Sequence, residues 1–101
     1  MKEFVIFIGG YSWTVRFEKK ELMQKSDGQT FTDHFLILIR DDLSIEMQRI
    51  VFIHEVVHAI LTTQGRYAQV NFNVEEMCEF IAYRQQELES LLETFDAQTK
   101  K

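Results

Sequence analysis

Two histidines stand four residues apart, at His54 and His58, and Glu55 directly follows the first of them. On an α-helix, residues i and i+4 lie on one face, so both imidazoles can direct a ring nitrogen at the same ion. Zinc accepts imidazole nitrogens at about 2.0–2.1 Å. A glutamate one step round the helix is placed to take a proton from a zinc-bound water. The spacing therefore predicts zinc-dependent hydrolysis, with His54 and His58 as zinc ligands and Glu55 as general base.

The residues around this motif predict a helix that is buried on most sides. Between Ser44 and Gln64 apolar residues occur nearly all the way round, Ser44 is a favourable N-cap, and Gly65 is a stop signal. Imidazoles and a carboxylate inside such a helix are unfavourable unless something binds them. We therefore favour a metal site over the alternative, a chance motif with one histidine packed in the core and the other in solvent.

A second long helix is predicted to begin at Asn73. Asn73 and Glu76 have the spacing of a capping box, and Phe72 and Met77 that of a hydrophobic staple. Capping gives Glu76 a structural role, and at 100° per residue it lies nearly opposite the core face. The expected core positions of this helix are Val74, Met77, Cys78, Ile81, Gln85 and Leu88, followed by Leu91 and Leu92.

Glu75 lies at the margin of that core face and is the carboxylate best placed to turn towards the two histidines. A catalytic zinc site has three protein ligands and a water, so Glu75 is predicted as the third ligand. Glu79, one turn further on, is expected to accept a ring N–H from a ligand histidine. The alternative is a solvated helix N-terminus, where the macrodipole favours carboxylates without any metal.

Composition limits the other function classes. The 101 residues form one expected domain, residues 1–101, and the net charge of −5 with no basic stripe argues against a nucleic-acid partner. The single cysteine, Cys78, cannot form an internal disulfide, which fits a reducing compartment. The first apolar run is too short for a membrane span or a signal peptide. We therefore expect a cytoplasmic protein without a membrane partner.

The N-terminal half predicts a small sheet. Residues 4–8 and 13–17 flank Gly9-Gly10 and predict a β-hairpin whose second strand has one wet face. Residues 19–25 form a short helix or a loop, and residues 26–28 are a turn signal. Residues 29–33 and 35–39 are the next two strands, closed by Asp41-Asp42. Tyr11, Trp13 and Phe17 are assigned to the core and the sheet surface, and His34 to the surface.

The run from Ile37 through Ala82 resembles a gluzincin-type zincin, in which His-Glu-x-x-His is completed by a glutamate on a downstream helix. The segment Glu75-Glu76-Met77-Cys78-Glu79 matches that second motif. The chain is also similar to small phage-type metallopeptidase-like proteins and, more distantly, to ImmA/IrrE-like domains. The resemblance implies a peptidase fold with a small sheet above the active-site helix and a following helix beneath it.

The chain departs from larger gluzincins in one respect. Their second subdomain contributes a tyrosine or histidine that stabilises the oxyanion, and we expect no such subdomain here. Tyr67, Tyr83 and His34 are possible substitutes, and the spacing does not select among them.

The sequence thus predicts an α+β minimal zincin with a small mixed sheet, an active-site helix and a following C-terminal helix. One zinc per chain would be bound by His54, His58 and Glu75, with water in the fourth position. The expected substrate is a protein or peptide, aligned along residues 29–33 as family strands commonly do, and the expected state is a monomer or weak oligomer.

Two alternatives stay open. One is a catalytically silent module that binds zinc and a partner. The other is an interaction protein whose helix at residues 85–97 pairs with another chain through the stripe Leu88, Leu91, Leu92 and Phe95, although the same stripe would also cover the domain's own core.

Overall fold

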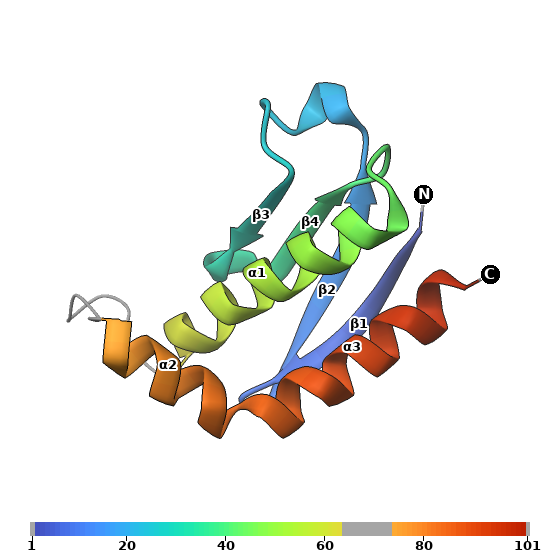
Figure 1. Cartoon of the computed structure of the whole chain (residues 1–101). Coiled ribbons are helices and arrows are strands. Elements are labelled where there is room, and N and C mark those ends of the chain that lie inside the picture. The colour runs from blue at the N-terminus through green and yellow to red at the C-terminus, as the bar shows by residue number, and fades with distance from the viewer. Residues whose placement is uncertain (1, 64–73, 101) are drawn as a thin grey trace.

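Four strands form one mixed sheet, and helices cover one of its faces (Figure 1). The computed structural model describes residues 2–63 and 74–100. The strand order is β1-β2-β4-β3, which leaves β1 and β3 at the edges. This arrangement confirms the α+β class. The strands are β1 (Glu3–Ile8), β2 (Tyr11–Glu18), β3 (Gly28–Phe31) and β4 (Leu36–Arg40).

The predicted hairpin is confirmed by the antiparallel pairing of β1 with β2. Gly9 and Gly10 form its turn with φ values of 59° and 84°, a region that glycine adopts without a steric penalty. Alternate residues of both strands point into the core, and Ser12, Thr14 and Arg16 lie on the wetter face. The buried residues of the hairpin are Phe4, Ile6, Ile8, Trp13, Val15 and Phe17.

The third and fourth strands exist but differ from prediction at their ends. β4 runs parallel to β2 and antiparallel to β3. The residues 32–34 form a 3-10 helix, so β3 ends at Phe31. Phe35 is left-handed at φ 49°, with its ring 5.2 Å from Tyr11 and 5.3 Å from Trp13. Phe35 therefore caps the aromatic end of the sheet instead of starting the strand. Residues 20–22, where a short helix or loop was expected, form a 3-10 helix.

Arg40, the last residue of β4, ties the start of β3 to the sheet. Its backbone N–H donates to Asp27 O at 2.9 Å, and its guanidinium binds Asp27 at 3.1 Å and Asp42 at 2.7 Å. The hydrogen bond from Arg40 lowers the pKa of the Asp42 carboxyl from its ordinary value. Gly28, which follows Asp27, is thereby held against the sheet. The predicted turn at residues 26–28 is thus wrong at its last residue, which is the first residue of β3.

The motif lies on α1 (Ile45–Thr63). Its predicted N-cap is confirmed, because Met47 N–H donates to Ser44 Oγ at 3.2 Å. One face packs on the sheet through Val51, Phe52, Val56, Ala59 and Ile60. The prediction of burial on most sides is wrong, since Ile45, Met47 and Ile50 are 45%, 39% and 61% exposed. A single sheet covers only one side of the helix, and apolar residues on the other side stay at the surface.

The second long helix is divided in two, α2 (Val74–Tyr83) and α3 (Gln85–Thr99). At Arg84 the backbone N–H binds Ile81 O at 3.0 Å, three residues back, which interrupts the regular helix. Within residues 2–63 and 74–100, none of the helices is long and apolar enough to cross a membrane.

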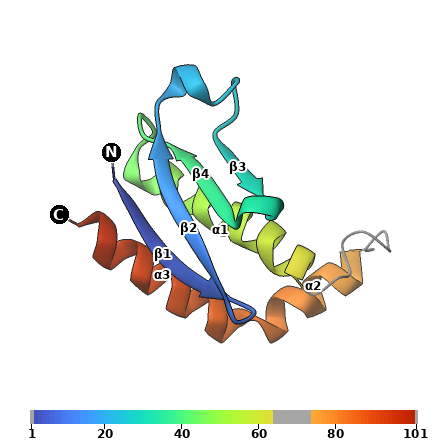
Figure 2. The same ribbon diagram turned by 180° about the vertical axis from the view of Figure 1, so that it is seen from behind.

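α3 lies beside α1 on the same face of the sheet (Figures 1 and 2). The resemblance implied instead a following helix beneath α1. Phe95 lies among three aromatic residues of the core, 4.7 Å from Phe52, 6.1 Å from Phe4 and 6.1 Å from Phe17 between ring centroids. Leu88 and Leu91 are buried with it. This stripe of α3 therefore covers the domain's own core.

α2 packs less deeply than predicted. Cys78, expected in the core, is exposed, and Ile81 is 41% exposed. The break after Tyr83 changes the direction of the chain, so the core face of α3 does not continue along α2. The predicted capping box and hydrophobic staple depend on residues 72–73 and on the side chains of Glu76 and Met77, which lie outside the described part of the chain.

Candidate active site

The two histidines lie side by side on α1, as their spacing predicts. Their ring centroids are 4.9 Å apart and the ring planes are inclined by 69°. The His54 side chain is 66% exposed, and His58, one turn later, is half-buried. A pair of imidazoles at this separation, open to solvent on one side, can approach a single ion from neighbouring turns of the helix.

The Glu55 carboxylate lies between His54 and β3, and its side chain is only 9% exposed. Thr30 Oγ1 donates to Glu55 Oε1 at 2.6 Å and also lies 3.2 Å from the main-chain oxygen of Glu55. The second carboxylate oxygen, Oε2, lies 4.0 Å from His54 Nε2. Glu55 is thus anchored through one oxygen, while the other lies near His54.

Thr30 was not identified from the sequence as a functional residue. It lies 25 residues before Glu55, and a threonine in a strand is common enough to carry no signal by itself. Only the packing of the edge strand β3 against α1 brings its hydroxyl to the carboxylate. A buried carboxylate needs such a donor, because an unpaired charge in the interior is strongly unfavourable.

Gly28 allows this close approach of β3 to α1. A Cβ at this position would clash with Val51 Cγ1 and would lie 3.1 Å from both Cγ and Oε2 of Glu55. The absence of a side chain therefore lets the strand reach the helix at the turn that carries Glu55. Gly28 and Thr30, two residues apart on one strand, together fix where the carboxylate lies.

A polar cleft of about 260 Å³ opens beside the carboxylate. It is lined by Glu55, His58 and Thr62, which share one face of α1. The opposite side is formed by Thr30 of β3 and by Thr32, which follows the strand. Thr62 Oγ1 donates to the main-chain oxygen of His58 at 2.8 Å. The cleft therefore borders β3, the strand predicted to align a substrate. This strand lies at an edge of the sheet.

The donor set fits zinc in kind but is incomplete as a site. Two imidazoles and a carboxylate are ligands that zinc takes. Glu75 lies in the first turn of α2 with an exposed side chain, and α2 lies beyond the C-terminal end of α1 (Figure 1). Across residues 2–63 and 74–100, no group of three or more histidine, cysteine, aspartate or glutamate side chains is arranged to hold a metal ion.

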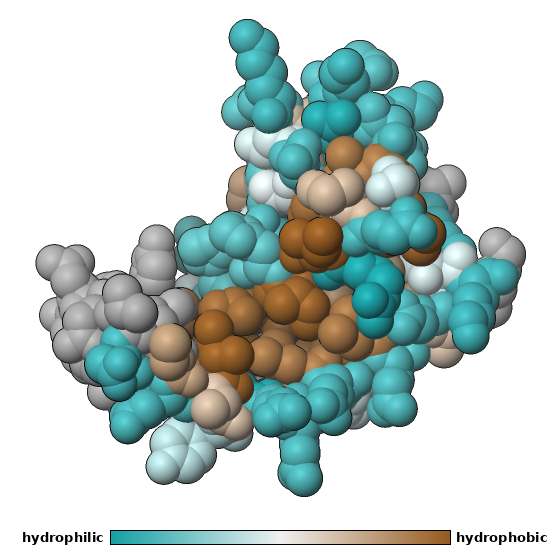
Figure 3. Space-filling view, viewed as in Figure 1, coloured by the Kyte–Doolittle hydropathy of each residue, from teal (hydrophilic) through white to brown (hydrophobic). Residues whose placement is uncertain are grey.

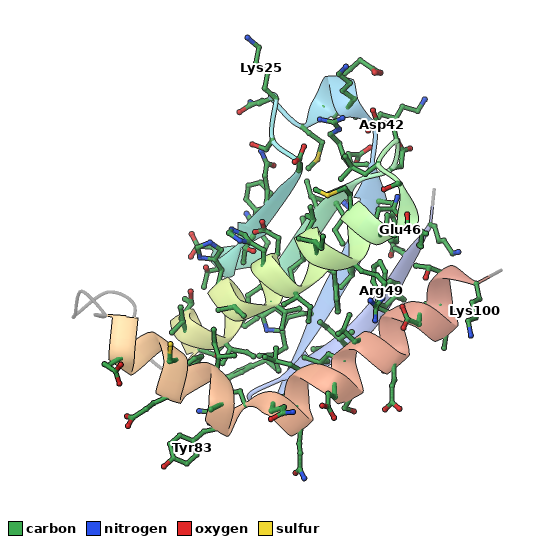
Figure 4. The ribbon with its side chains drawn as sticks, viewed as in Figure 1. Lys25, Asp42, Glu46, Arg49, Tyr83 and Lys100 are labelled. Carbon is green, nitrogen blue, oxygen red and sulfur yellow. The ribbon has the colours of Figure 1, made fainter. Side chains whose placement is uncertain are left out.

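Of the possible oxyanion donors that the structure describes, neither His34 nor Tyr83 lines the cleft. Tyr83 is 82% exposed at the end of α2, and its ring points away from α1 in Figure 4. His34 is exposed in the 3-10 helix after β3, which confirms its surface assignment. Tyr67 lies outside the described residues.

A larger cavity, about 540 Å³, lies away from the motif and carries different chemistry. Its lining combines the exposed lysines Lys2 and Lys19 with the acids Glu18 and Asp41, and it contains no histidine. We therefore assign the candidate site to the smaller cleft, which is lined by His58 and the anchored Glu55 carboxylate and has the His54 ring 4.9 Å from that of His58.

Comparisons with protein-family models, with curated proteins and with solved structures found no match to this chain. The assignment of the site consequently rests on the motif and on the geometry of the residues around it.

Proposed function

We propose that this chain is a zinc-dependent metallopeptidase of minimal zincin type, which hydrolyses peptide bonds. The observation that carries the proposal is the arrangement of three side chains of α1. The His54 and His58 rings lie 4.9 Å apart, and a buried Glu55 carboxylate is held with one oxygen 4.0 Å from His54 Nε2. The single cysteine fits a reducing compartment such as the cytoplasm, and the proposed substrate is a peptide or protein.

In this proposal His54 and His58 bind one zinc ion per chain, with Glu75 as the third protein ligand. When bound, zinc supplies a Lewis acid that polarises a carbonyl oxygen and lowers the pKa of water. Glu55 would act as general base, accepting a proton from water through Oε2, the oxygen that lies near His54. Thr30 keeps the other oxygen in place, so the carboxylate needs no reorientation before the proton transfer.

We assign peptide alignment to the outer edge of β3. Among the described residues this strand pairs only with β4, and its residue Thr30 lines the cleft together with Thr32, which follows the strand. An extended peptide can add to such an edge through main-chain hydrogen bonds. The scissile bond would then lie beside Glu55 and His58.

Removing either ligand histidine should abolish zinc binding. His54→Ala and His58→Ala each leave one imidazole, so zinc content should fall from about one per chain to near zero after dialysis. The thermal midpoint in zinc should fall as well, because a metal bound only by the folded state stabilises it. Mass spectrometry under native conditions and elemental analysis measure the content.

His34→Ala is the matched control for these variants, since His34 is the third histidine of the chain, is exposed in the 3-10 helix after β3 and does not line the cleft. It should retain full zinc content. If His54→Ala, His58→Ala and the wild type bind equal zinc, the assignment of the metal site is wrong.

The third ligand is tested by changing the acids of α2 one at a time. Glu75→Gln should weaken zinc binding strongly, because a neutral amide is a poor substitute for a carboxylate ligand. Glu76→Gln should leave zinc bound and change stability by no more than about 1 kcal/mol, since glutamine also closes a capping box. Zinc affinity measured with a competing chromophoric chelator distinguishes the two. If only Glu76→Gln loses zinc affinity, Glu76 rather than Glu75 is the third ligand.

A catalytically silent zinc-binding module is the second candidate. The burial of Glu55 and its bond to Thr30 favour it, because both are also what a structural carboxylate needs. This module would bind zinc, hydrolyse no peptide in a library digest, and keep its function in a Glu55→Gln variant.

A further inference from the structure

An apolar groove of about 290 Å³ lies between α1 and the α2–α3 pair, on the surface that Figure 3 shows in brown. It is lined by residues from all three helices, of which five are apolar and two polar: Ile53, Ile81, Ala82, Leu88 and Leu92, with Gln85 and Glu89. Ile50, one turn before Ile53, extends the apolar surface along α1 and is 61% exposed. Aliphatic side chains gathered in a concave surface are unfavourable in water unless something covers them.

The helices that form this groove are strongly acidic. Arg49, labelled in Figure 4, is their only lysine or arginine, and its guanidinium binds Asp96 of α3 at 2.9 Å. Arg84, at the junction of α2 and α3, lies 3.7 Å from Glu87. The acidic residues of the three helices are Glu46, Glu55, Glu75, Glu76, Glu79, Glu87, Glu89, Glu93 and Asp96.

Two of these acids border the groove on α3. Glu89 lines it, and Glu93 lies one helical turn further along the same side; both are exposed. The groove thus combines an apolar floor with an acidic rim along its α3 side.

We propose that this groove docks an amphipathic α-helix of a partner protein, with an apolar stripe flanked by lysine or arginine. Helix-in-groove recognition uses apolar side chains at i, i+3, i+4 and i+7, and a volume of about 290 Å³ holds a few of them. Basic flanks complement the acidic rim and speed association. A second copy of this chain fits poorly, because a two-fold contact would set the acidic α3 of one copy against that of the other.

The test uses two synthetic helical peptides and the full-length protein. Both peptides carry the same leucine stripe, and one has lysine flanks where the other has glutamate flanks. Fluorescence anisotropy should show the lysine peptide binding at least tenfold more tightly, with the difference shrinking as salt is raised. Mass spectrometry checks that the peptides stay intact.

Variants at the groove assign the binding surface. Ile50→Ser and Ile81→Ser should each weaken binding of the lysine peptide about tenfold or more, and both residues are exposed enough for the fold to survive. Phe7→Ser is the matched control, because Phe7 is 68% exposed on β1. Glu89→Lys should remove the preference for the lysine peptide, whereas Glu21→Lys, an exposed change outside the three helices, should not.

Three results would overturn the proposal. In the first, neither peptide binds. In the second, both peptides bind equally tightly. In the third, Ile50→Ser and Ile81→Ser leave the affinity for the lysine peptide unchanged. A concentration-dependent dimer in sedimentation that Ile81→Ser abolishes would assign the groove to a second copy instead. None of these measurements depends on zinc or on hydrolysis, so the outcome is independent of the proposed function.

Discussion

Glu55→Gln should retain the fold and the zinc but lose peptide hydrolysis by about 10²–10⁴-fold, the usual contribution of a general base. Glutamine has nearly the same size as glutamate and can still accept the hydrogen bond from Thr30, which now meets Glu55 Oε1 at 2.6 Å. What it lacks is a carboxylate that takes a proton. The change therefore separates proton transfer from both folding and metal binding.

The assay is a digest of a broad peptide library, with chelator treatment followed by zinc add-back. Glu46→Gln is the matched control, because Glu46 lies exposed in the first turn of the same helix (Figure 4) and away from the histidines. It should cleave as the wild type does. Equal cleavage rates for wild type and Glu55→Gln would refute the mechanism, and cleavage that persists in chelator would identify a contaminating enzyme.

Gly28→Ala should lower the free energy of unfolding by about 1–3 kcal/mol, the usual range for adding a methyl group to a packed contact. The new Cβ would clash with Val51 Cγ1, and a β-branched side chain has few rotamers by which to move aside. The Cβ would also lie 3.1 Å from Glu55 Oε2. Hydrolysis should therefore fall more than the loss of folded protein explains. Denaturant unfolding, read beside the peptide digest, measures both effects.

A double-mutant cycle with Val51→Ala isolates the contact. Removing the Cγ1 methyl group makes room for the new Cβ, so Gly28→Ala should be less destabilising in the Val51→Ala background than in the wild type. Strictly additive effects would show that the strand is not held at this distance from α1 by the missing side chain.

The sequence by itself determined the features that depend on local spacing. Alternation over a few residues with Gly9-Gly10 between them specified the hairpin, because side-chain direction in a strand has a period of two. Ser44 before an apolar run specified the start of α1. His54 and His58 met on one face, because a separation of four residues is about one helical turn.

Local spacing failed where neighbours distant in sequence compete. Phe35 was predicted to start a strand, but stacking on Tyr11 and Trp13 accompanies a left-handed backbone there. The exposure of Ile50 and of Ile81 follows from how much of each helix the sheet covers, and periodicity does not contain that information. The break at Arg84 could not be predicted either, because no proline or glycine lies at or beside it in the sequence.

The environment of Glu55 was decided only by the tertiary structure. The sequence placed this carboxylate beside two histidines, but the donor that anchors it comes from Thr30 and the space it occupies from Gly28, both on a strand that precedes the helix. Helical geometry fixes which residues share a face, whereas the partner of a buried charge depends on which strand the fold brings to that face. For that physical reason the sequence identified the candidate site residues His54, Glu55 and His58, and only the packing of β3 on α1 identified what holds the Glu55 carboxylate in place.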